Sequence, residues 1–137
     1  MLAIRVSFPD AHIEIMGSAN FLEMVNGRFY ADFVSRFDHV DVASLFTHNA
    51  HISPSLLKRF GKKDVIVLFV SDHEQILTNN LKATGARHVI QYDPFPSPGK
   101  SLHIIDHFLH VLDLMGIPSF YKTPKIFLNE EDIFFAD

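Results

Sequence analysis

Asp64-Val65-Ile66-Val67-Leu68-Phe69-Val70 is the stretch that decides the fold of this chain. Six apolar residues in a row, without alternation, are typical of a strand that helices cover on both faces, as in parallel sheets. Ser71 and Glu74 follow at the spacing of a capping box, in which the hydroxyl accepts from a helix amide and the carboxylate reaches back. The sequence therefore predicts a capped helix ending at Gly85 and then a strand over His88–Tyr92, which together form a βαβ unit.

Strand and helix patterns alternate along the rest of the chain as well. Leu2–Val6 has the pattern of a helix end, because no N-cap precedes it and Phe8-Pro9-Asp10 stops it. Val42–Phe46 fits either a helix or a strand. The remaining expected elements are two strands and three helices: strands His12–Met16 and Phe33–Phe37, and helices Asn20–Val25, 53–60 and Ser101–Met115. This order predicts an α/β fold, a Rossmann-like three-layer sandwich with a mainly parallel sheet.

The length of the chain predicts one domain. Its 137 residues, 47% of them apolar, suffice for one hydrophobic core but not for two. We assign residues 1–116 to this domain. Beyond it, Gly116-Ile117-Pro118 ends the last helix, Lys122–Leu128 is expected to be extended and residues 129–132 are acidic. Residues 117–137 are therefore expected to form a linker towards a second domain that the sequence does not contain.

Composition excludes several classes of function. The net charge of −4 argues against nucleic acid as a partner, since phosphate neutralisation needs clustered Lys and Arg, and the one basic cluster, at residues 58–63, fits a solvated helix end. The chain has no cysteine, which excludes disulfides, a thiolate nucleophile and a Cys-based zinc site. The longest apolar run, Val65–Val70, is far shorter than the ~20 residues of a transmembrane helix, and no signal-peptide pattern is present. We therefore expect a cytoplasmic protein.

Several segments, in this order and at this spacing, resemble glycosyltransferase family 9, the ADP-heptose:lipopolysaccharide heptosyltransferase group. Near the N-terminus they are Phe8–Gly17, similar to the family's "fP-x-A-x-I-x-hydrophobic-x-G" stretch, and Tyr30–Val34, similar to its "y-v-D-x-V" segment. In the last third they are Pro94-Phe95-Pro96 with His103, Leu109, Leu112, Gly116 and Ile117, and then Pro124, Ile126, Leu128 and Glu131-Asp132 of the linker. The resemblance covers nearly the whole chain.

The resemblance implies an architecture and a reaction. The family has two Rossmann-like domains facing each other across a cleft, the GT-B architecture, in which the N-terminal domain receives the acceptor and the C-terminal domain binds the nucleotide sugar. This chain would be most of the first domain. The family's opening strand and the Gly-Asp turn that carries its general base have no counterpart before Met1, and the donor domain has none after Asp137. The implied reaction is metal-free transfer of a heptose from an ADP-sugar to a growing core oligosaccharide with inversion. We expect the chain alone to be inactive, because transfer needs donor and acceptor held together.

The carboxyl ends of the expected strands supply the candidate site residues, because ligands of open parallel sheets bind there. The acceptor-cleft candidates are Gly17, Ser18, Asn20, Ser71, Asp72, His73 and Asp93, together with His103 in the last helix. Simpler structural roles also fit: a helix cap for Ser71, a turn for Gly17 and a strand end for Asp93. Asp72 and His73 could form the acid/base pair of a small standalone enzyme, but no nucleophile stands at a recognisable spacing. The chain has no glycine-rich phosphate loop, so no nucleotide cofactor is expected.

Three histidines stand at helical spacing in the segment before Gly116. His103, His107 and His110 lie at i, i+4 and i+7 with Asp106 beside them, so four potential metal ligands share one face. The apolar residues of the segment, however, lie on the opposite face: Ile105, Phe108, Leu109, Leu112 and Met115. The pattern therefore predicts a solvated or cleft-facing histidine stripe, and no metal is expected.

A different class of function is also open. The apolar tail residues Ile133, Phe134 and Phe135 would be exposed without a partner, and a sheet lacking a strand leaves backbone groups open at an edge. The alternative is therefore a non-catalytic α/β binding or assembly module that self-associates. The partners expected in the two cases are a sugar or lipopolysaccharide-core acceptor and a second copy of the chain.

Overall fold

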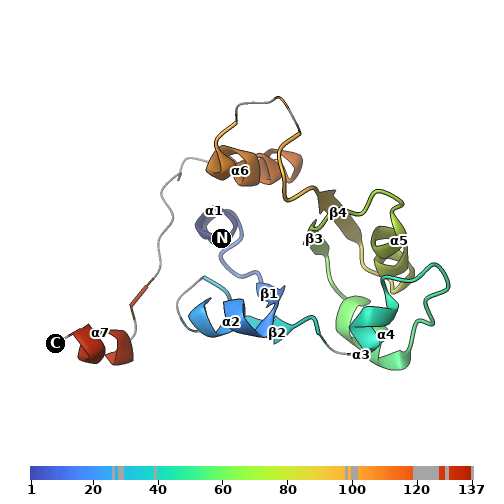
Figure 1. The fold of residues 1–137 in the computed structure, drawn as a ribbon, viewed down its shortest axis with the longest axis horizontal. Coiled ribbons are helices and arrows are strands. Elements are labelled where there is room, and N and C mark those ends of the chain that lie inside the picture. Colours follow the sequence, from blue (N-terminus) through green and yellow to red (C-terminus); the bar gives the residue numbers. More distant parts are fainter. Residues whose placement is uncertain are drawn as a thin grey trace.

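The computed structural model describes residues 1–25, 27, 30–38, 40–97, 99, 102–118, 127–128 and 130–136. These residues form short helices and strands in an alternating order (Figure 1). The elements are α1 (Leu2–Ser7), β1 (Glu14–Gly17), α2 (Ala19–Val25), β2 (Phe33–Arg36), α3 (Val40–Ser44), α4 (Pro54–Phe60), β3 (Val65–Phe69), α5 (Ile76–Ala83), β4 (His88–Tyr92), α6 (Ile104–Leu114) and α7 (Glu130–Ala136). The mixed α/β class predicted from the sequence is confirmed.

The strands form two parallel pairs. β1 pairs with β2 in the register Glu14 opposite Phe33, and β3 pairs with β4 in the register Val65 opposite His88. Among the described residues no strand joins the two pairs into one sheet. α5 connects the parallel strands β3 and β4, which confirms the predicted βαβ unit. α2 connects the parallel strands β1 and β2 in the same way and forms a second unit near the N-terminus.

The middle of the β3–β4 pair is covered on both faces, as its unbroken apolar sequence predicts. Ile66 and Leu68 of β3 pack on a core formed by α3, α4 and α5, whose buried residues are Val42, Leu45, Leu56, Phe60, Leu77 and Leu81. Val67 of β3 and Ile90 of β4 pack on a second core between α1 and α6, whose buried residues are Ala3, Val111, Leu112 and Ile117. Alternate residues of β3 thus enter different cores.

Several helix boundaries follow the sequence signals. α4 begins after Ser53, whose hydroxyl accepts a 3.3 Å hydrogen bond from Leu56 N–H, with Pro54 at the first helical position. α6 ends in a Schellman motif: Gly116 has a φ of +67°, and Ile117 N–H donates to Leu112 C=O at 2.9 Å. Both boundaries were predicted and are confirmed.

Other segments differ from expectation or lie outside the described residues. The ambiguous segment Val42–Phe46 is mostly helical, because α3 covers Val40–Ser44. Where the sequence suggested the acidic end of a linker, the chain forms α7. The expected extended stretch Lys122–Leu128 lies outside the described residues except for Phe127 and Leu128.

Arg5 fastens α1 to the start of the β1–β2 pair. Its guanidinium donates to Asp32 Oδ2 at 2.6 Å and to three backbone carbonyls, those of Pro9, Ala11 and Tyr30. Ile13 N–H donates to the same Asp32 oxygen at 2.7 Å, and this bond, followed by the Arg5 contact, lowers the pKa of Asp32. One side chain therefore holds together α1, the loop after it and the chain entering both strands.

Candidate functional site at the carboxyl ends of β3 and β4

A polar cluster joins the carboxyl ends of β3 and β4. Ser71 Oγ lies 3.2 and 3.3 Å from the two carboxylate oxygens of Asp93 and donates to that carboxylate. Phe95 N–H donates to Asp93 Oδ1 at 3.0 Å, and Gln91 Nε2 donates to Val70 C=O at 2.8 Å. We call Ser71, Asp93 and Phe95 the Asp93 cluster. Its position beyond the carboxyl ends of parallel strands is the one at which ligands bind in open α/β sheets.

Asp72, and not Ser71, caps α5. Its carboxylate accepts from Thr78 N–H at 2.8 Å, from Thr78 Oγ1 at 2.7 Å and from Leu77 N–H at 3.3 Å. The predicted capping box is wrong because Gln75 takes a left-handed conformation, with a φ of +56°, and α5 begins only at Ile76. Ser71 is thereby left to pair with Asp93.

The same contacts set the protonation of Asp72. Burial alone would raise its pKa, but the bonds from Thr78 and from the backbone amides outweigh burial, so the pKa of Asp72 is lowered. Asp72 is therefore an ionised carboxylate whose oxygens are occupied by α5. His73 beside it is exposed.

His107 anchors α6 to the end of β4. Its side chain is buried, Nε2 lies 2.8 Å from the carbonyl oxygen of Asp93, and Nδ1 lies 3.3 Å from the hydroxyl of Tyr92. A carbonyl can only accept, so we assign the proton to Nε2, and Nδ1 then accepts from Tyr92 in the neutral ring. Burial, and secondarily the charge of Asp113, raises the pKa of Tyr92, which keeps this hydroxyl protonated.

The three histidines at the start of α6 and within it lie in different surroundings, so they do not form the single solvated or cleft-facing stripe that was predicted. His103 is the N-cap, and its Nδ1 accepts from Ile105 N–H at 3.2 Å. His110 is exposed and pairs with Asp113 Oδ2 at 2.9 Å. His107 is buried while Phe108, expected inside, is 40% exposed, so the predicted assignment of faces is wrong for these two residues. Among the described residues, no three His, Cys, Asp or Glu side chains gather as metal ligands would.

Aromatic rings pack against one another at the carboxyl ends of β3 and β4. Phe69, at the end of β3, packs edge-on against Phe108 with ring centroids 5.5 Å apart and against Tyr92 at 6.2 Å. Phe95, which belongs to the Asp93 cluster, is 72% exposed. Phe69, Tyr92 and Phe108 were not among the predicted site residues. Aligning the two predicted parallel strands would have indicated that two of these rings are neighbours, since Phe69 is directly opposite Tyr92 in the register.

Gly17, Ser18 and Asn20 lie at the end of the other strand pair. Gly17 closes β1, and a Cβ on it would approach Leu22 Cδ2 to 3.3 Å. Ser18 C=O accepts from the amides of Phe21 and Leu22 at 3.1 Å each, which begins α2, and Asn20 is exposed. Within the described part of the chain, none of the hydrogen bonds of Gly17 or Ser18 reaches the Asp93 cluster. The structure therefore brings Ser71 and Asp93 together and leaves the β1 residues as a separate group.

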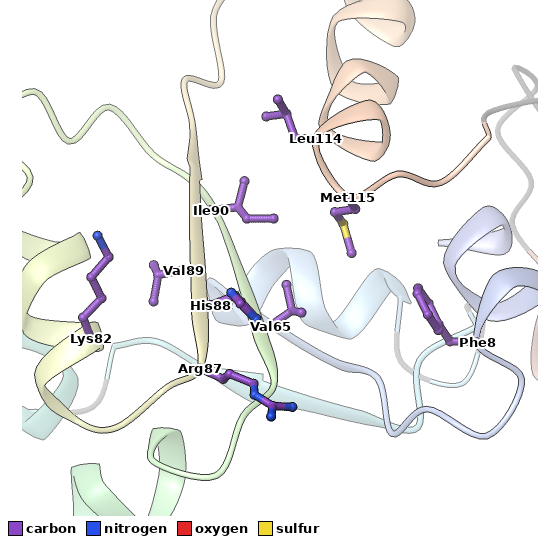
Figure 2. Close-up of a pocket in the computed structure, with 9 residues that line it drawn as sticks. All are labelled: Phe8, Val65, Lys82, Arg87, His88, Val89, Ile90, Leu114 and Met115. Atoms are coloured by element: carbon purple, nitrogen blue, oxygen red, sulfur yellow. The ribbon is translucent and has the colours of Figure 1, made fainter.

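A hollow of about 460 Å³ lies at the opposite end of the strands, near their amino ends (Figure 2). Its lining is mostly apolar, from Val65, Val89, Ile90, Leu114, Met115 and Phe8, and its polar lining residues are Lys82, Arg87 and His88. This is the end of a parallel sheet away from the usual ligand position. The hollow contains none of the predicted site residues.

Comparison with known proteins finds no matching family model, no similar curated protein and no similar solved structure. Within the described residues, no helix is long and apolar enough to cross a membrane.

Proposed function

We propose that this chain is a saccharide-binding α/β domain of Rossmann-like type. In this proposal it corresponds to the acceptor-side domain of a glycosyltransferase resembling the ADP-heptose:lipopolysaccharide heptosyltransferases. The observation that carries the proposal is the Asp93 cluster at the carboxyl ends of β3 and β4, which combines a fixed carboxylate with the exposed ring of Phe95. Binding sites commonly combine a few fixed polar groups with apolar and aromatic surroundings in this way.

The Asp93 carboxylate retains capacity for a ligand. Its two oxygens offer about four lone-pair positions. Ser71 Oγ and Phe95 N–H occupy part of them, and they fix the carboxylate in place. Adjacent hydroxyls of a sugar ring can donate to the remaining positions through charge-assisted hydrogen bonds. The exposed ring of Phe95 offers an apolar surface for the C–H face of the same sugar.

The role that fits this site is acceptor binding. The sequence has no glycine-rich phosphate loop that would hold a nucleotide sugar. Because transfer depends on holding donor and acceptor together, we expect the chain to bind the acceptor without hydrolysing or transferring ADP-heptose by itself.

Calorimetric titration with an oligosaccharide released from a lipopolysaccharide core tests this function. Asp93→Asn and Phe95→Ala should each weaken binding about tenfold, which corresponds to roughly 1.4 kcal/mol. Asp64→Asn and Phe46→Ala are matched controls, because they change the same residue types at exposed positions outside the cluster and should bind like the wild type.

Two results would oppose this function. One is binding that is absent, or that the Asp93 and Phe95 variants leave unchanged. The other is turnover by the isolated chain that disappears in Asp72→Asn or His73→Gln, which would favour a standalone enzyme.

A second candidate is an assembly module that self-associates through α7. Its Ile133, Phe134 and Phe135 side chains are all exposed, Phe135 to 94%. Adjacent exposed rings of this kind are typical of interaction surfaces. Sedimentation velocity over a range of concentrations tests it: the wild type should dimerise and the Phe134→Ser, Phe135→Ser double variant should not, whereas a monomer at every concentration would exclude the candidate.

A further inference from the structure

Each strand pair leaves an inner edge without a ladder partner. β1 pairs only with β2 and β3 only with β4 in the part of the chain that the structure describes. β1 and β3 lie between β2 and β4, so their open edges are the inner ones (Figure 1). An unpaired strand edge presents a row of backbone donors and acceptors that can bind another strand.

The two open edges belong to the same layer of the fold. Met16 of β1 packs against the same core as Ile66 and Leu68 of β3. At the amino ends of the two strands, Lys63 Nζ lies 2.7 Å from Glu14 Oε2. This contact between the two edges is an ion pair between side chains, whereas neighbouring strands of one sheet would be joined by ladder hydrogen bonds.

β3 also exposes more apolar surface than its sequence predicts. Val65 and Phe69, at its two ends, are 43% and 44% exposed although the run they belong to is typical of a strand buried on both faces. The hollow at the amino end extends past Val65 to Phe8, and Met115 lies between them in the close-up (Figure 2). A strand added beside β3 would cover this surface.

We infer that the open edges of β1 and β3 together accept one extended, apolar β-strand from another polypeptide. This strand would hydrogen-bond to both edges and join the two pairs into one continuous sheet, as in β-strand addition. Its side chains must be apolar on both faces, because α1 and α6 cover one face of the sheet and α3, α4 and α5 the other. A second copy of the chain fits less well, because an inserted strand needs both of its edges free, and each strand of the described residues already has one edge paired.

Amide hydrogen exchange followed by NMR tests this inference on the wild-type chain. The probe is the synthetic peptide Lys-Lys-Val-Ile-Val-Ile-Val-Lys-Lys, whose lysines keep it soluble. The control is the same peptide N-methylated at all of its valines and isoleucines, which keeps its apolar character but removes the ladder donors of both edges. The unmodified peptide should slow exchange at least tenfold for amides in both Glu14–Gly17 and Val65–Phe69, and the methylated one should not.

Protection of only one of the two edges, equal protection by both peptides, or no protection would overturn the inference. No saccharide is present in this experiment, so its failure would leave the proposed acceptor site untouched. Failure of the saccharide titration would in turn say nothing about the open edges.

Discussion

Replacing His107 by alanine should destabilise the chain more than any other histidine substitution in α6. The change removes a hydrogen bond to Asp93 C=O and one to Tyr92 Oη, each worth about 0.5–1.5 kcal/mol, and leaves the carbonyl with an additional desolvation cost. With the lost burial of the ring, the expected reduction in the free energy of unfolding is about 2–4 kcal/mol.

Urea denaturation followed by circular dichroism measures this effect. His110→Ala is the matched control, because His110 is exposed and its pairing with Asp113 should contribute about 0–1 kcal/mol. His107→Gln should fall between wild type and His107→Ala, since an amide can still donate to the Asp93 carbonyl. In a double-mutant cycle, Tyr92→Phe and His107→Ala should show a coupling free energy of about 0.5–1 kcal/mol.

The reasoning is refuted if His107→Ala and His110→Ala differ by less than about 0.5 kcal/mol, the usual range of surface substitutions. That result would indicate that His107 is exposed to solvent, as helical periodicity alone predicts.

Three further predictions concern the cores, a close backbone approach and pH. Leu56→Ala should cost about 2–5 kcal/mol in urea denaturation, because Leu56 is 2% exposed, whereas Leu57→Ala, one residue on and 45% exposed, should cost under about 1 kcal/mol. Gly61→Ala should lower the melting temperature more than Gly116→Ala, because a Cβ at Gly61 would lie 2.5 Å from a backbone oxygen while Gly116 has open space and only a φ of +67° to strain it; equal effects would contradict this. Because the pKa of Asp72 is lowered in the folded chain, the unfolded chain binds more protons near pH 4. The free energy of unfolding should therefore fall as the pH drops below 3.8, the ordinary pKa of an aspartate. Melting curves of Asp72→Asn should show a smaller pH dependence than those of the wild type.

The β3–α5–β4 unit could be predicted because its signals are local. An unbroken apolar run, a following helix pattern and a second strand fix a parallel pair without reference to distant residues. The Schellman end of α6 is equally local, since Gly116 and Ile117 follow the last apolar turn.

The orientation of His107 could not be predicted because its partners are distant. Helical periodicity places polar residues on the solvent side, but the carbonyl of Asp93 and the hydroxyl of Tyr92 reach His107 from the end of β4 and satisfy its ring inside the protein. With His107 facing inward, Phe108, the next residue along α6, is 40% exposed.

The candidate site was predicted in position but not in detail. Ser71 and Asp93 meet because neighbouring parallel strands end at the same edge, which the strand order alone predicts. Asp72 caps α5 instead of Ser71 because Gln75 takes a left-handed conformation. The capping-box spacing in the sequence does not indicate this conformation.

The most direct test of the account is to map, by amide chemical shifts, where a core oligosaccharide binds the wild-type chain. Ser71 and Phe95 report on the carboxyl ends of β3 and β4, and Val65 and Ile90 on the hollow towards the amino ends of the same strands. The account predicts saturable shifts at Ser71 and Phe95 with Val65 and Ile90 unmoved. Shifts confined to Val65 and Ile90, or no shifts at saturating saccharide, would contradict it.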